Sequence, residues 1–125
     1  MDAASSTPVN TDHSMKIRAK LTDDTAEIKL IISHPMETGR KKDDFGLLIP
    51  AHFIQLVTIT VNDKTVLETQ WGTGIAKNPY LTLKVKGVKP GDKVTVIWHD
   101  NLGESASQDA LVRGGLTVIK LALYD

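Results

Sequence analysis

Histidine is the residue type of this chain best suited to chemistry near neutral pH. The chain has four histidines, at His13, His34, His52 and His99. Two of them lie in short segments that also hold a proline, His34–Gly39 and Ile49–Ile54. No two histidines have the His-x-His or His-x-x-x-His spacing of a local metal site. Metal or acid–base chemistry would therefore require the fold to bring distant residues together.

Nucleophilic catalysis finds little support in the sequence. The chain contains no cysteine, which excludes thiolate nucleophiles, disulfides and cysteine-ligated zinc or iron–sulfur sites. Ser33 precedes His34, but neighbouring side chains in a strand point to opposite faces and cannot form a nucleophile–base pair. The segment 72–74, Gly-Thr-Gly, lacks the lysine and the helix of a phosphate-binding loop. We therefore expect no catalytic, cofactor-binding or metal-ligating residues. His34 and His52 are expected to bond loop backbone, with His99 on a solvated face opposite Trp98.

Composition and charge restrict the partners. Lysine plus arginine and aspartate plus glutamate number 15 each, so the formal net charge is zero. This balance removes the usual electrostatic reason to expect nucleic acid or an anionic membrane as partner. No apolar run reaches the 18 residues of a membrane span. Residues 1–14 contain no apolar signal segment and are expected to be a leader or a disordered extension, without a secretory signal peptide.

The elements that must position the histidines are strands, because apolar residues alternate with period two. Residues 17–21 and 26–32 alternate in this way around the turn Thr22–Asp24 and predict a hairpin. A run from Phe53 to Val61 should place Phe53, Val57, Ile59 and Val61 on one face, and Asn62-Asp63 should form a tight turn. Further strands are expected over residues 65–71, 80–86, 93–100 and 104–108. About seven short strands with frequent turns predict an all-β antiparallel sandwich.

Several motifs, in order, carry a family resemblance. They are His34–Gly39, Ile49–Ile54, Trp71-Gly72, Lys77–Tyr80, Gly91–Val94, Trp98–Asn101 and Gly103–Ser105. This series resembles SoxZ, a subunit of the SoxYZ sulfur carrier of bacterial thiosulfate oxidation, over residues 15–110. Residues 1–14 and the tail 111–125 have no counterpart in the family pattern. Leu116–Tyr124 in that tail has the length of one extra strand.

The resemblance implies an immunoglobulin-like sandwich and a non-catalytic role. A SoxZ-like chain would form a heterodimer with SoxY, whose mobile arm carries sulfur on a cysteine to the sulfur-oxidising enzymes of the Sox system. It would reach the periplasm together with SoxY, without a signal peptide of its own. We expect the partner surface to include the 34–39 loop and nearby aromatic residues, namely His34, Met36, Glu37, His52, Phe53, Trp71 and Tyr80.

One enzymatic alternative stays open. Strands could bring His34, His52 and His99 together with a carboxylate such as Glu37 or Asp100, giving a metal-dependent redox enzyme on a β-sandwich. A related fold hosts iron in superoxide-reducing proteins, whose sites use a cysteine ligand, and this chain has no cysteine.

Overall fold

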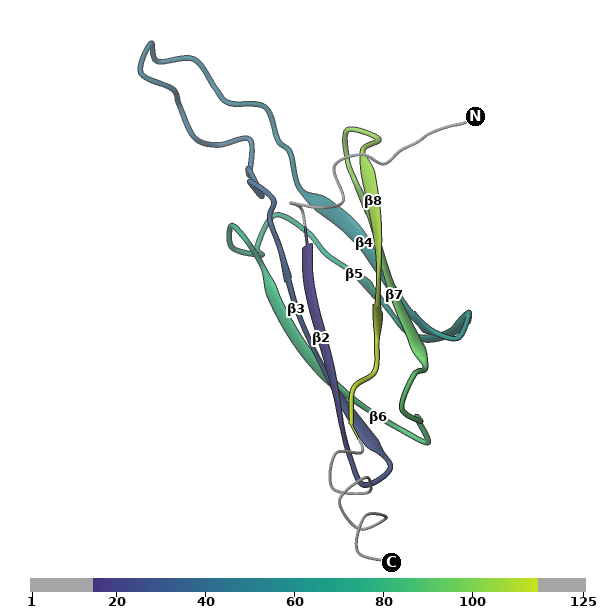
Figure 1. Ribbon diagram of the computed structural model, residues 1–125. Helices are drawn as coiled ribbons and strands as arrows, with labels where there is room; N and C mark the ends of the chain where they lie inside the picture. The colour runs from purple at the N-terminus through teal and green to yellow at the C-terminus, as the bar shows by residue number, and fades with distance from the viewer. Residues whose placement is uncertain (1–14, 115–125) are drawn as a thin grey trace, which may run out of the picture.

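A computed structural model describes residues 15–114, which form seven antiparallel strands in two facing sheets and no helix (Figure 1). The strands are β2 (Met15–Thr22), β3 (Thr25–Ile32), β4 (Ile54–Val61), β5 (Lys64–Gln70), β6 (Tyr80–Lys86), β7 (Lys93–Asp100) and β8 (Ser105–Leu111). One sheet has the order β2-β3-β6 and the other β5-β4-β7-β8. The predicted all-β sandwich is confirmed. None of the described residues lies in a helix long and apolar enough to cross a membrane.

The core lies between the two sheets because each strand buries alternate residues. In β3 the buried side chains are Ala26, Ile28, Leu30 and Ile32, while the residues between them face outward. In β7 the buried face holds Val94, Val96 and Trp98. Removing a side chain such as Ile28 from water contributes about 1.5–3 kcal/mol, so the period-two pattern is the main local determinant of the sandwich.

The β4–β5 hairpin confirms one local prediction and corrects another. Asn62 and Asp63 have φ values of 50° and 69°, the left-handed conformation that a tight turn needs. The predicted start of this strand at Phe53 is wrong, since Phe53 is partly buried against the core but lies outside β4. β4 starts one residue later with Ile54, which is fully buried, and a register shift follows before Leu56. This bulge lets Ile54 and Val57 point to the same core despite their odd spacing.

The chain after β7 extends further than expected. β8 runs to Leu111 rather than ending at residue 108, and Val112 is buried. Arg113 then bonds the edge of β2, since its N–H donates to the Ala19 carbonyl (2.9 Å) and its carbonyl accepts from Leu21 (2.7 Å). The expected leader 1–14 and the apolar run 116–124 lie outside the described residues.

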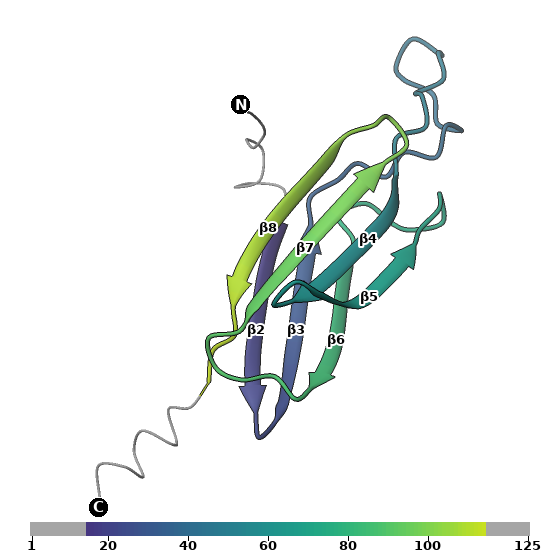
Figure 2. The same cartoon turned by 90° about the vertical axis from the view of Figure 1, so that its right-hand side faces the viewer.

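A long hairpin loop, residues 37–52, projects beyond one end of the sandwich; we call it the arm (Figures 1 and 2). Its base is closed by two backbone hydrogen bonds, from the Glu37 N–H to the His52 carbonyl (2.7 Å) and from the His52 N–H to the Glu37 carbonyl (3.0 Å). A second bridge joins Lys42 and Leu48 nearer the tip. The arm begins and ends beside His34 and His52, so the two histidines of the sequence prediction lie at its root.

Candidate functional site

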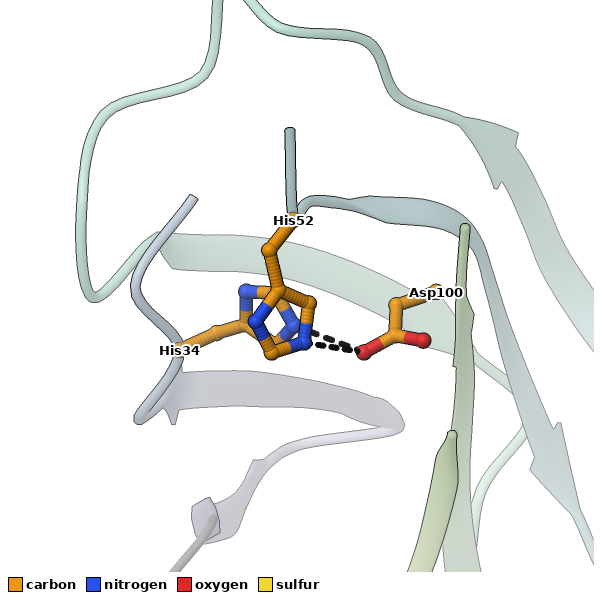
Figure 3. A group of neighbouring side chains, drawn as sticks. All are labelled: His34, His52 and Asp100. Carbon is orange, nitrogen blue, oxygen red and sulfur yellow. Dashed lines mark hydrogen bonds and ion pairs between the residues drawn. The ribbon is translucent and has the colours of Figure 1, made fainter. Parts of the chain in front are cut away.

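A buried hydrogen-bond network joins His34, His52 and Asp100 at the root of the arm (Figure 3). Asp100 ends β7, and its side chain has no exposed surface. Its Oδ2 atom lies 3.1 Å from His34 Nε2 and 2.8 Å from His52 Nε2. His52 Nε2 also lies 2.9 Å from Oε1 of Glu104. Glu104 is exposed and lies between β7 and β8, directly before the first residue of β8. The network therefore ties both sheets and the arm to one carboxylate.

The other oxygen of Asp100 shapes the turn between β7 and β8. Oδ1 accepts hydrogen bonds from the backbone N–H groups of Leu102 (3.0 Å) and Glu104 (2.8 Å). Asp100 thus accepts four hydrogen bonds, two at each oxygen. A carboxylate is the side-chain group that can do this without donating a proton itself. These four donors compensate for the cost of burying the negative charge of Asp100.

The tautomer of His34 follows from its two hydrogen bonds. The backbone N–H of Met36 donates to His34 Nδ1 at 3.1 Å, so Nδ1 carries a lone pair. The ring proton must then be on Nε2, where it is donated to Asp100. Met36 adopts φ 48° to place its N–H there. His34 is in this way a two-sided connector between the start of the arm and the end of β7.

Two asparagines hold the backbone on either side of the histidines. Asn78 Oδ1 accepts the His34 N–H (3.1 Å), and the Asn78 N–H donates back to the His34 carbonyl (3.1 Å). Asn101 spans His52: its Oδ1 accepts the Phe53 N–H (2.8 Å), and its Nδ2 donates to the Ala51 carbonyl (2.9 Å). These paired contacts fix both rings in position, because neither backbone can shift without breaking two hydrogen bonds.

The network also shifts the pKa values of His52 and Asp100. Burial alone would lower the pKa of His52, but its hydrogen bonds to Asp100 and Glu104 and the charge of those carboxylates outweigh burial and raise the pKa above 6.5. Burial alone would raise the pKa of Asp100. Hydrogen bonds from His34, the Glu104 backbone and His52 outweigh it, so the pKa lies below 3.8. Asp100 is therefore ionised at neutral pH.

The seven residues predicted for the partner surface lie in different environments. His34 and Met36 are 4% and 5% exposed, so their side chains belong to the interior. Glu37 and His52 lie at the closed base of the arm, and Phe53 and Trp71 pack partly against the core. Tyr80 is 62% exposed. The expectation for His52 is also corrected, because its ring bonds two carboxylates and not loop backbone.

The metal alternative meets two obstacles. His99 is exposed, on the face of β7 opposite Trp98 and Asp100, so it does not join His34 and His52. The ring atoms of His34 and His52 and an Asp100 oxygen do lie within 4.8 Å of one another. Metal-bound histidine normally donates its other ring N–H, whereas His34 Nδ1 accepts one. Binding a metal through Nε2 would make His34 an imidazolate or break the Met36 bond. The donors do not fit a metal in this arrangement.

The same network lacks the parts of a hydrolase. An aspartate paired with histidine orients a general base in several enzymes, but the base must face a hydroxyl or thiol nucleophile. Hydrogen bonds connect these histidines to carboxylates and to backbone, and no hydroxyl or thiol belongs to the network. Within residues 15–114 this arrangement can position the arm and exchange a proton at His52. Its geometry favours a structural role.

The tip of the arm is an ordered turn that exposes apolar side chains. Asp43 Oδ1 accepts the N–H groups of Phe45 (2.8 Å) and Leu47 (3.0 Å), and the Asp43 N–H donates to the Leu47 carbonyl (2.8 Å). Phe45 is 88% exposed, and Leu47 and Leu48 are 66% and 60% exposed. Such a group on a projecting, hydrogen-bonded turn is typical of a protein-contact site. The sequence analysis did not predict this group.

The class defined by this fold and site is an all-β sandwich whose histidine network supports a projecting arm. The family comparison then gives the identity: the chain matches the family of sulphur oxidation protein SoxZ over residues 15–110 and belongs to that family. A sequence search of curated proteins finds no match.

Solved structures show the same fold at low sequence identity. The superoxide reductase from Nanoarchaeum equitans superimposes with a TM-score of 0.61 and 16% identity, covering 84% of this chain and 96% of that protein. A hypothetical protein from Pyrococcus horikoshii gives 0.60 and 14%, with 81% and 88% covered. A superoxide reductase (neelaredoxin) from Ignicoccus hospitalis gives 0.53 and 17%, with 82% and 80% covered. Identities this low show a shared fold and leave the activity of this chain to its own residues.

Proposed function

We propose that this chain is a non-catalytic subunit of a sulfur carrier complex, which binds and presents SoxY. The observation that carries the proposal is membership of the SoxZ family over residues 15–110. In this scheme the sulfur is attached to a cysteine of SoxY, and SoxY brings it to the sulfur-oxidising enzymes of the Sox system. This chain contains no cysteine, which agrees with a scheme in which SoxY alone carries the sulfur. The complex works in the periplasm, and the chain is exported together with SoxY.

The arm supports the choice of partner surface. Phe45, Leu47 and Leu48 form an exposed apolar group at the tip, and fully burying side chains of this size contributes about 1.5–3 kcal/mol each. The network around Asp100 fixes the root of the arm, so little conformational freedom is lost on binding. A pre-organised apolar tip suits a stable complex. We therefore place SoxY against the arm tip rather than against the buried His34 and Met36.

Co-expression of the full chain with SoxY tests the proposal. We expect a stable 1:1 complex by size-exclusion chromatography with light scattering. The double substitution Phe45→Ser/Leu47→Ser should weaken it by about 100-fold, since two buried apolar contacts contribute at least about 3 kcal/mol. Leu111→Ser, at a similarly exposed leucine of β8, is the matched control and should bind as the wild type does.

Each outcome has a separate meaning. Two monomers at micromolar concentration would reject the carrier-subunit function. A complex that forms equally well with the Phe45→Ser/Leu47→Ser variant would keep the function and reject the arm tip as its interface. Equal weakening by Leu111→Ser would also reject the arm tip, because the loss would then not depend on the position of the apolar residue.

A further inference from the structure

The outer face of the three-stranded sheet concentrates positive charge. Along this face β2, β3 and β6 expose the cations Lys16, Arg18, Lys20, Lys29, Lys84 and Lys86, and we call this surface the basic face. Of the outward residues on these strands, Glu27 alone is acidic. The chain as a whole has equal numbers of acidic and basic residues. The fold therefore gathers cations on one surface, although the net charge of the whole chain is zero.

Strand register fixes how the charges are arranged. Lys16 lies opposite Ile31, and Ile31 lies opposite Tyr80 on the other side. In the next row Arg18 lies directly opposite Lys29. Like charges at directly opposed positions destabilise a sheet, and the compensating contact of Lys29 is a 3.8 Å ion pair with the half-buried Glu27. The Arg18–Lys29 pair therefore does not serve to stabilise the sheet.

The remaining rows continue the pattern. Lys20 and Lys84 both flank Glu27, and Lys86 lies opposite Thr25 in the last row. Asp23 and Asp24 occupy the turn beyond that row. The outer face of the other sheet differs, because there Glu68 and Asp109 lie among threonine, serine, glutamine and apolar residues, with Lys93 in the row at one end. Six cations and one acidic residue thus gather on the outer face of the three-stranded sheet.

We propose that the basic face is a transient docking surface for the acidic face of a second protein. Four rows spaced two residues apart span about 20 Å, and three strands span about 10 Å, well below the roughly 800 Å² per partner of a stable interface. Lysine is depleted in stable interfaces, whereas clustered cations accelerate association and make it sensitive to salt. The site is separate from the arm tip and does not depend on the proposed function.

A protein fits this face better than nucleic acid does. Glu27 stands at the centre of the cations and would repel a phosphate backbone, but it can pair with a lysine of a protein partner. Ile31 and Tyr80 are 45% and 62% exposed at the arm end of the face and offer apolar contact. The zero net charge also weakens the long-range attraction on which non-specific nucleic-acid binding depends.

The test uses the isotope-labelled full chain and two anionic probes of equal charge, a glutamate-rich peptide and a short DNA duplex. With peptide, we expect NMR shift changes confined to β2, β3 and β6 and binding that weakens from about 20 mM to about 200 mM salt. Arg18→Glu/Lys86→Glu should lose about tenfold in affinity, because two attractive contacts become repulsive. Arg18→Gln/Lys86→Gln should lose less. The control Lys64→Glu/Lys77→Glu makes the same charge change outside the face and should stay within about twofold of wild type.

Three results would overturn the proposal. Shift changes spread equally over Arg40, Lys41 and Lys64 would show general attraction to any cation of the surface. Tighter binding of the duplex than of the peptide at β2, β3 and β6 would assign the face to nucleic acid. Absence of peptide binding at the lower salt concentration would leave the charge cluster without a docking role.

Discussion

Replacing Asp100 by asparagine should destabilise the protein strongly, although the two side chains have nearly the same size. Asp100 accepts four hydrogen bonds, from His34 Nε2, His52 Nε2 and two backbone N–H groups. An asparagine side chain has one oxygen and one NH₂ group. In either amide orientation the NH₂ group faces two donors. His34 cannot adapt by moving its ring proton, because its Nδ1 accepts from Met36.

The size of the effect follows from these contacts. A hydrogen bond to a charged group contributes about 1.5–3 kcal/mol, and a buried unpaired donor costs about 1–3 kcal/mol. If the NH₂ group faces the histidines, His52 keeps a partner in Glu104 and the main loss is the His34 bond. If it faces the turn, the backbone bonds from Leu102 and Glu104 are both lost. We expect Asp100→Asn to lower the free energy of unfolding by about 3 kcal/mol. For a domain of this size that corresponds to a fall in Tm of about 10–20 °C.

Urea unfolding at pH 7, followed by Trp fluorescence and circular dichroism, measures this change. Glu104→Gln is the matched control, because it alters a carboxylate of the same network whose side chain is 61% exposed. We expect its effect to stay below about 0.5 kcal/mol. An Asp100→Asn variant as stable as Glu104→Gln would refute the account, since it would mean that the four hydrogen bonds of Asp100 do not stabilise the fold.

Four further predictions concern the same end of the sandwich. Because folding raises the pKa of His52 above 6.5, the stabilising contribution of His52 is complete below pH 6.5 and is lost as pH rises through the folded pKa. The urea midpoint of the wild type should therefore fall as pH rises through that pKa, and the midpoint of His52→Gln should fall less. Asp100 has a lowered pKa, so its contribution is present above pH 3.8 and is lost as pH falls through the folded value, and Asp100→Asn should flatten the acid limb of the same curve. Gly39→Ala should lower the free energy of unfolding by about 1–2 kcal/mol, because Gly39 has φ +84° and an added Cβ would lie 3.2 Å from Ala51 Cβ. Thermal unfolding measures this change, and an unchanged Tm would contradict the described packing at the root of the arm. Zinc and iron(II) should not bind stoichiometrically in calorimetric titrations of the full chain, and one equivalent bound by wild type but not by His52→Ala would revive the redox alternative.

Much of the fold could be predicted because burial on one face imposes period two. Alternation located the β2–β3 hairpin and β6 and β7 well. It failed where geometry breaks the period, at the bulge between Ile54 and Leu56, because an inserted residue changes which side chains face inward. It also ended β8 too early, since its residues after Ala106 are small, polar or half-exposed and leave a weak hydrophobic signal.

The site was harder to predict because its members are distant in the chain. His34, His52 and Asp100 come from the end of β3, the end of the arm and the end of β7, and no local spacing links them. Alternation along β7 does contain a clue: if Val96 and Trp98 point inward, Asp100 does so too and His99 points out. Asn78 and Asn101 stood within the motifs of the resemblance, but only the strand pairing shows that they hold the histidine backbones.

The hydrogen bonds at the root of the arm also have a consequence for the order of folding. They join residues 44, 48 and 66 positions apart, so each one closes a long loop. Contacts of this range form only after both sheets have assembled, and we expect the arm to reach its final orientation as a late event. Trp98, whose ring meets that of His34 edge-on at 5.1 Å, should report this step as a fluorescence change after the main burial of the core. In newly made chains the arm would then reach the orientation needed for binding only when folding is complete.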